Sequence, residues 1–135
     1  MRAVTLLLSA IVITACGGPL KFTVPSSAAA PGADAKIVAD VSEEQNQTQL
    51  AVEVSNLAPA SRVKEGMSSY TAWYRRDSNA SWARIGGLEY DADSRAGKVS
   101  GSVPERAFDF EITAEASEGP ASPSSSVVFS QRIAE

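Results

Sequence analysis

The sequence predicts an all-β domain, an antiparallel two-layer β-sandwich of seven or eight strands. Three observations predict this fold class. Apolar and polar residues alternate along 48–55 and again along 107–116, which is the period-two pattern of strands with one buried face. Turn-forming residues separate the apolar runs at short intervals, and no stretch shows a helical period. Because each amphipathic strand must bury one face, two sheets packed face to face are expected.

The expected strands are 36–41, 48–55, 69–76, 81–85, 88–90, 98–103, 107–116 and 126–133. Strands 69–76 and 81–85 are expected to pair as a hairpin across a polar turn, and 88–90 to pair with 98–103. The clearest alternation lies in 107–116. Its apolar members, expected in the core, are Phe108, Phe110, Ile112 and Ala114. Its polar members, expected to face solvent, are Asp109, Glu111, Thr113 and Glu115.

The chain is expected to divide into a signal peptide, a tether and a folded domain. Residues 1–15 carry one positive charge, at Arg2, and then an almost wholly apolar run with the length of a secretory signal. That run is too short to span a bilayer, which takes about 20 apolar residues. Residues 16–35 are rich in Ala, Pro, Gly and Ser and are expected to form a flexible tether, in which 21–24 could add a short edge strand. The sandwich is expected to occupy residues 36–135.

Cys16, the only cysteine, ends the apolar run. Together with Ile13, Thr14 and Ala15 it forms a motif that resembles the lipobox of bacterial lipoproteins, with Ile13 in place of the common leucine. The resemblance implies cleavage before Cys16 and a lipid on that residue, so that the protein is extracytoplasmic and anchored in a membrane of the cell envelope. Gly17 replaces the aspartate that retains many such proteins at the inner membrane, which implies the outer membrane if the host is Gram-negative. The alternative is an ordinary secretory signal followed by an incidental cysteine.

The composition excludes several functional classes. Without residues 1–15 the chain carries 11 basic and 16 acidic residues and no basic cluster, which argues against nucleic acid as a partner. The chain contains no histidine, which removes the commonest metal ligand and the commonest general base. No Gly-x-Ser-x-Gly motif is present. We therefore expect a protein that is not an enzyme and that uses no cofactor or metal.

Two further resemblances concern the folded domain. Trp73-Tyr74-Arg75 is similar to the third strand of immunoglobulin-like domains, which implies that architecture with a tryptophan in the core. The second comprises Tyr70-Thr71-Ala72-Trp73, Phe108 and the run Pro-Ser-Ser-Ser-Val-Val at 123–128. These segments are similar to the extracytoplasmic β domain of some bacterial anti-sigma factors. That resemblance implies a sensory or regulatory accessory role.

Acidic residues provide two weak candidates for a site. Asp91, Asp93 and Gly97 superficially resemble a calcium loop, but its fifth position is Arg95 and its twelfth is Ser102, which do not suit calcium. A solvated hairpin turn is the preferred interpretation. The acidic pairs at 43–44 and at Glu111 with Glu115 are expected to lie on solvated surfaces.

One aromatic and basic cluster remains as a candidate binding surface. Across the expected hairpin, aromatic and arginine side chains can form a stacking surface for a sugar or a protein. Its residues are Tyr74, Arg75, Arg76, Trp82 and Arg84. The alternative is that the aromatic residues fill the core and the arginines cover its rim. The sequence thus predicts a lipid-anchored, non-catalytic binding or scaffolding module with an envelope protein or a glycan as partner. The regulatory accessory domain remains the alternative.

Overall fold

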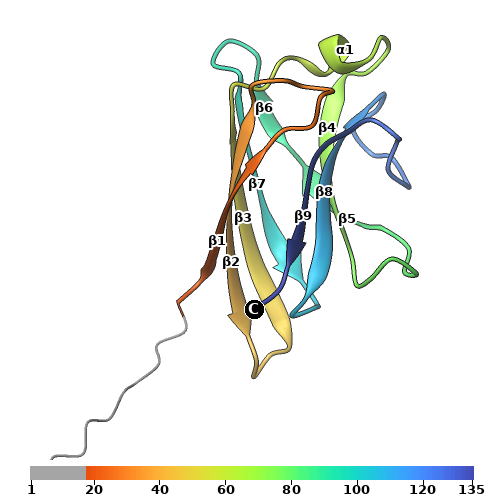
Figure 1. Ribbon diagram of the computed structural model, residues 1–135. Coiled ribbons are helices and arrows are strands. Elements are labelled where there is room, and N and C mark those ends of the chain that lie inside the picture. The colour runs from red at the N-terminus through yellow and green to blue at the C-terminus, as the bar shows by residue number, and fades with distance from the viewer. Residues whose placement is uncertain (1–17) are drawn as a thin grey trace, which may run out of the picture.

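The computed structural model describes residues 18–135, which form two antiparallel β-sheets packed face to face (Figure 1). The five-stranded sheet has the order β1-β2-β3-β7-β6, and the four-stranded sheet has the order β5-β4-β8-β9. The strands are β1 (Leu20–Pro25), β2 (Asp34–Ser42), β3 (Gln47–Ser55), β4 (Ser69–Arg75), β5 (Ala83–Gly87), β6 (Glu89–Asp91), β7 (Ala96–Val103), β8 (Phe108–Glu115) and β9 (Val127–Ile133). One helical turn, α1 (Ala60–Val63), lies between β3 and β4.

The predicted two-layer β-sandwich is confirmed, with nine strands in residues 18–135 instead of seven or eight. The order β2-β3-β7-β6 facing β4-β8-β9 is that of a constant-type immunoglobulin sandwich. Strand β5 extends one sheet beyond β4, and β1 extends the other beyond β2. Both expected hairpin pairings are present, β4 with β5 and β6 with β7.

The core between the sheets follows the alternation of the sequence. In β3 the buried residues Leu50, Val52 and Val54 alternate with exposed residues, as expected for a strand with one solvated face. The apolar residues of β8 also enter the core, and Phe110 is 1% exposed near the middle of that strand. These strands lie in opposite sheets, so their apolar faces meet across the sandwich.

Strands β4 and β8 are buried on both faces, which corrects two expectations. Tyr70 and Ala72 of β4 belong to the core cluster between the sheets. Trp73 alternates with them and is fully buried, but on the opposite face, where it pairs with Glu111 of β8. Trp73 is therefore buried outside the intersheet core. Glu111, Thr113 and Glu115, which were expected to face solvent, are buried as well. Both faces are buried because these two strands are central in their sheet and other segments of the chain pack on its outer face.

Residues 20–35 are part of the domain and not a tether, contrary to expectation. Strand β1 pairs with β2 along its whole length, from Leu20 opposite Ala39 to Pro25 opposite Asp34. Val24 is buried in the core, and the loop that follows β1 buries Ala30 and Ala33 as well. Small and Pro-rich residues therefore form an edge strand and a tight return here. The folded domain extends back to Leu20, sixteen residues before the expected start at Lys36.

One backbone hydrogen bond and one close side-chain contact link the two sheets at the two open sides of the sandwich. On one side, the amide of Ser27, just after β1, donates to the carbonyl of Val128 in β9 at 2.8 Å. On the other side, β5 lies close to β7. A Cβ at Gly101 would come within 2.9 Å of the Ile85 side chain, so glycine at that position permits the approach. The outer face of the four-stranded sheet, which carries the candidate site, is thus held on a closed framework.

Candidate functional site

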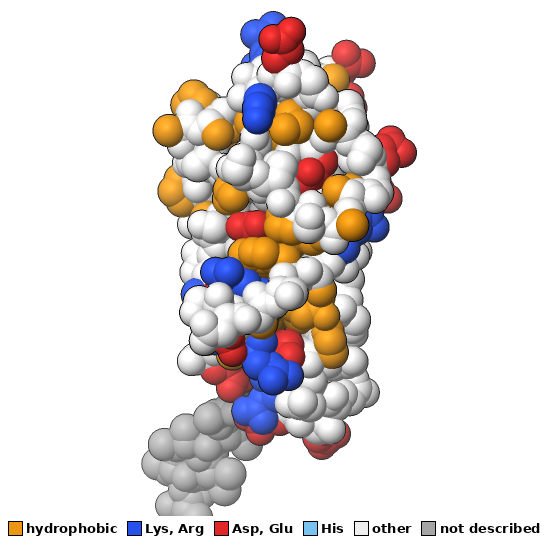
Figure 2. All heavy atoms as spheres, turned by 90° about the vertical axis from the view of Figure 1, so that its right-hand side faces the viewer, with side chains coloured by type: hydrophobic (Ala, Val, Ile, Leu, Met, Phe, Trp, Pro, Cys, Tyr) orange, Lys and Arg blue, Asp and Glu red, His pale blue; other side chains and the backbone are white. Residues whose placement is uncertain are grey.

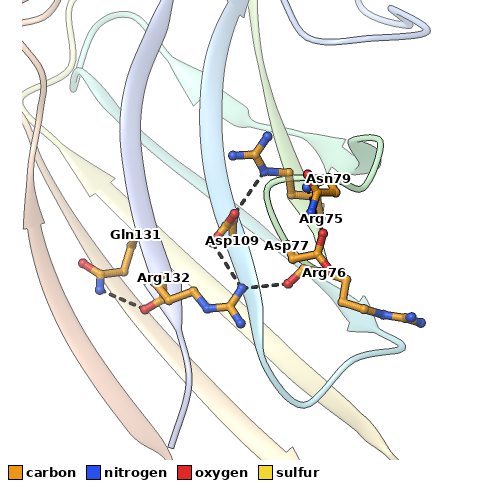
Figure 3. Close-up of polar contacts among 7 residues, drawn as sticks. All are labelled: Arg75, Arg76, Asp77, Asn79, Asp109, Gln131 and Arg132. Atoms are coloured by element: carbon orange, nitrogen blue, oxygen red, sulfur yellow. Dashed lines mark hydrogen bonds and ion pairs between the residues drawn. The ribbon is translucent and has the colours of Figure 1, made fainter.

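The centre of the candidate site is Asp109, which bridges two arginines on the outer face of the four-stranded sheet (Figure 3). Arg75 of β4 donates from Nε to Asp109 Oδ2 at 3.0 Å, and Arg132 of β9 donates from Nη1 to Oδ1 at 3.2 Å. The same Arg132 nitrogen also donates to the carbonyl oxygen of Arg76 at 2.7 Å. Arg132 thereby reaches across β8 and links three adjacent strands, which fixes the orientation of both guanidinium groups.

Trp82 completes this arrangement from the segment that precedes β5. The guanidinium carbon of Arg75 lies 4.4 Å from the centroid of the Trp82 ring, a cation–π contact. As a residue, Trp82 is only partly buried. Arg75 is therefore held between a carboxylate and an aromatic ring, and the terminal nitrogens of its guanidinium form no hydrogen bond within residues 18–135.

A hollow of about 560 Å³ lies between these side chains. Its lining is Arg75, Trp82, Asp109, Phe110, Glu111, Val127, Ser130, Gln131 and Arg132. Figure 2 looks onto this side of the molecule and shows basic and acidic side chains close together on its lower half, with hydrophobic side chains between them. The volume falls within the range of about 300–1,000 Å³ that is usual for small-molecule sites. The charged lining residues are two arginines and two carboxylates.

Glu111 is the most buried charged residue of the hollow, with 8% of its surface exposed. Burial raises the pKa of its carboxyl above the ordinary value of 4.5, because the charged form loses hydration. Arg75 lowers this pKa in part, whereas the nearby carboxylates of Glu115 and Asp109 raise it further. Glu111 is buried as a residue, but its carboxylate accepts no hydrogen bond within residues 18–135 and its oxygens are not among the enclosed atoms, so they are open to a ligand in the hollow.

We expect Glu111→Gln to change how stability depends on pH. The folded-state pKa of Glu111 lies above its unfolded value, so the folded protein binds more protons than the unfolded chain between these two pKa values. The free energy of unfolding that Glu111 contributes is therefore fully present below the unfolded pKa and is lost as pH rises through the folded pKa. Glutamine carries no charge at any pH, so the variant should gain stability relative to the wild type from acidic to neutral pH.

Urea unfolding across that pH range measures this difference. Glu53→Gln, which removes a carboxylate at an exposed position of β3 on the other sheet, is the matched control for the substitution itself. A stability difference between Glu111→Gln and the wild type that stays constant with pH would contradict the expectation.

A second, buried polar cluster lies beside the hollow on the same face. Trp73 Nε1 donates to Thr113 Oγ1 at 2.9 Å, and Thr113 Oγ1 donates to Glu115 Oε1 at 2.7 Å. The amide of Ser124 donates to the same carboxylate oxygen at 2.7 Å. Residues 117–126 therefore fold back over the sheet, and the carbonyl of Glu118 accepts a hydrogen bond from Arg84 of β5. The composition of this loop predicts irregular structure, and the loop is held by hydrogen bonds at Glu118 and at Ser124.

We expect Thr113→Val to lower the free energy of unfolding by about 1–3 kcal/mol. The change preserves the shape of the side chain but leaves the Trp73 indole N–H without an acceptor in a fully buried place. Thr71 offers a matched control, because it lies directly opposite Thr113 and is equally buried, yet its hydroxyl has no hydrogen-bond partner. Thr71→Val should therefore be neutral or stabilising. Equal losses for both variants in urea unfolding would contradict this account.

The structure brings together only part of the predicted surface. Arg75 and Trp82 are in contact, as expected from the hairpin. Tyr74 lies on the opposite face of β4 and packs edge-to-face on Phe108, so it is not part of the surface. Arg76 is exposed and pairs with Glu105, while Arg84 holds the 117–126 loop. Both arginines lie outside the hollow.

The residues that sequence reasoning missed come from β8 and β9. Asp109, Glu111, Ser130 and Arg132 all line the hollow, yet they are distant in sequence from the hairpin that carries Arg75 and Trp82. The available signal was the acidic side of the alternation in 107–116, which marks one continuous face of a strand. The alternation does not show which strands lie next to this one in the sheet, so it could not predict which residues share the site.

The remaining candidates lie elsewhere. In the Asp91–Gly97 turn, Asp91 Oδ1 accepts a hydrogen bond from the amide of Asp93, and Arg95 adopts a left-handed backbone conformation, as in a solvated turn. Within residues 18–135, no group of three or more carboxylate, cysteine or histidine side chains is placed to hold a metal ion. The predicted lipidation site Cys16 and the cleavage motif Ile13, Thr14 and Ala15 lie outside the described residues.

Comparisons with models of known protein families, with curated proteins and with solved structures found no match. Within the described part of the chain, no helix has the length and apolar character needed to cross a bilayer.

Proposed function

We propose that this protein is a lipid-anchored, non-catalytic binding module of the cell envelope. The observation that carries the binding role is the preorganised hollow on the outer face of the four-stranded sheet. Asp109 pairs with Arg75 and Arg132, and Arg75 contacts the Trp82 ring. These side chains therefore form a preorganised surface to which a ligand can bind. A surface that served only for solubility would have no need of arginines that are ordered in this way.

The anchoring role rests on the motif around Cys16. The lipid attached to Cys16 holds the module at a membrane, and the lipobox resemblance implies three acyl chains. Two or more chains give stable attachment, since each buried CH₂ contributes about 0.8 kcal/mol. The envelope, at the outer membrane of a Gram-negative host, is then where the hollow meets its ligand.

Fractionation of cells that express the full chain tests the anchor. We expect the wild type to remain with membranes after a carbonate wash, and Cys16→Ser, which lacks the thiol that carries the lipid, to be absent from that fraction in cleaved form. A cleaved Cys16→Ser protein that still withstands the wash would overturn the anchoring role.

Co-sedimentation of residues 18–135, which form the sandwich and lack the lipid that would itself hold the protein to membranes, with envelope fragments tests the binding role. We expect the wild type to bind, and the double variant Arg75→Ala/Trp82→Ala to lose binding while its circular dichroism is unchanged. Arg76→Ala is the matched control, because Arg76 neighbours Arg75 in sequence but lies outside the hollow. Equal binding by the wild type and the double variant would overturn the role of the hollow.

A further inference from the structure

We propose that the hollow binds a neutral saccharide, with Trp82 as the platform for a sugar ring and Arg75, Glu111 and Ser130 as hydrogen-bonding partners of its hydroxyl groups. The proposal rests on the binding role proposed above and names the ligand class. It follows from the charge balance of the hollow, the distribution of its donors and acceptors, and the placement of the aromatic ring.

The charge balance of the hollow favours an uncharged ligand. Its charged lining residues are Arg75 and Arg132 on one side and Asp109 and Glu111 on the other, two of each sign. Both arginines are already paired with Asp109. An anionic ligand would meet the Glu111 carboxylate, and a cationic ligand would meet the two guanidinium groups. A charged ligand would therefore lose its hydration without full compensation.

The donors and acceptors of the hollow match the chemistry of vicinal hydroxyl groups. Each hydroxyl can donate one hydrogen bond and accept others. Arg75 presents terminal N–H groups that are unused within the protein, and Glu111 presents a carboxylate that only accepts while it is charged. Ser130 lies opposite Glu111 in the register of β8 with β9 and adds a hydroxyl of its own. A donor, an acceptor and a group that is both thus line one hollow.

Trp82 supplies the apolar part of such a site. A sugar ring has one face of C–H groups, which packs on the electron-rich face of an aromatic ring. The Arg75 guanidinium covers one face of the Trp82 ring, 4.4 Å from its centroid, and the residue as a whole is only partly buried, so a sugar ring would use the opposite face. The preorganised ring lowers the entropic cost of binding.

The protein provides its own probe for a titration of the full chain. Of its two tryptophans, Trp82 lines the hollow, whereas the indole N–H of Trp73 is buried and bonded to Thr113. We would follow both indole N–H resonances by NMR while adding maltose, cellobiose or N,N′-diacetylchitobiose. The expected result is a saturable shift of the Trp82 signal with at least one disaccharide and a Trp73 signal that stays in place. No shift with any of them, or displacement of a bound disaccharide by inorganic phosphate, overturns the proposal.

Variants of the full chain sharpen the titration. Glu111→Gln keeps the shape of the side chain but removes the charge, so we expect the dissociation constant for the bound disaccharide to rise about tenfold, as for one charge-assisted hydrogen bond. Arg76→Ala should leave that constant unchanged. Binding by Glu111→Gln that equals the wild type overturns the role of Glu111 and with it the proposed site.

A second experiment separates this proposal from the binding role itself. Envelope fragments are treated either with protease or with periodate, which cleaves vicinal diols, before co-sedimentation with residues 18–135, which lack the lipid. We expect binding to survive the protease and to be lost after periodate. The opposite pattern would retain the binding module but overturn the saccharide, in favour of a protein partner. No binding to untreated fragments would remove the binding role and the saccharide together.

Discussion

Phe110→Ala should lower the free energy of unfolding by about 3–5 kcal/mol. Phe110 is 1% exposed near the middle of β8 and belongs to the cluster between the two sheets, so its truncation leaves a cavity that neighbouring strands cannot close. Domains of this size have about 5–15 kcal/mol of stability in total. The variant should therefore unfold at much lower urea than the wild type, or remain unfolded in its absence.

Val38→Ala is the control for this variant. Val38 lies in β2 with 37% of its surface exposed, on the outer face of the other sheet. Its truncation should change the stability by no more than about 0.5 kcal/mol. A loss below about 1 kcal/mol for Phe110→Ala would show that β8 turns its other face to the core.

A chain that begins at Asp34 should be far less stable than one that begins at Gly18. The shorter chain lacks β1, and the loss of buried Val24 alone costs about 1.5–3 kcal/mol. Leu20 and Phe22, which pack against the core, add to this loss. The backbone of β2 also loses its pairing from Asp34 to Ala39 and becomes an open edge.

Thermal unfolding and light scattering of the two chains measure both effects. The chain from Gly18 should unfold cooperatively, and the chain from Asp34 should unfold at lower temperature and associate through its exposed edge. Equal unfolding midpoints would mean that β1 adds nothing to the domain and acts as the tether that its composition indicates.

The alternation of apolar and polar residues correctly predicted the strands that have one buried face and one exposed face. Leu50, Val52 and Val54 in β3 alternate with exposed residues, and the structure has them in the core. In β4 and β8 the rule fails, because both faces are covered. Trp73 competes with Tyr70 for the core, and composition alone does not decide which of them points inward.

The candidate site was predictable only where it is local in sequence. Arg75 and Trp82 come from one hairpin, so the prediction brought them together correctly. Asp109 and Arg132 reach the site through the pairing of β8 with β4 and β9, which the sequence does not specify. The same limit explains the expected tether. The sequence left a short edge strand possible at 21–24, but it did not specify β2 as the partner or the burial of Ala30 and Ala33 in the loop that follows.

The position of β1 sets the geometry of the proposed anchored form. With the first strand starting at Leu20, only three residues separate it from a lipid on Cys16. At about 3.3–3.6 Å per residue, a linker of this length keeps the start of β1 within roughly 15 Å of the lipid. Figure 1 shows that the start of β1 and the C-terminus lie at the same end of the sandwich, opposite α1. In the proposed anchored form that end lies against the bilayer, and residues 18–135 include no stalk that could cross the space between two layers of the envelope. In that form, a ligand can bind only close to the membrane surface.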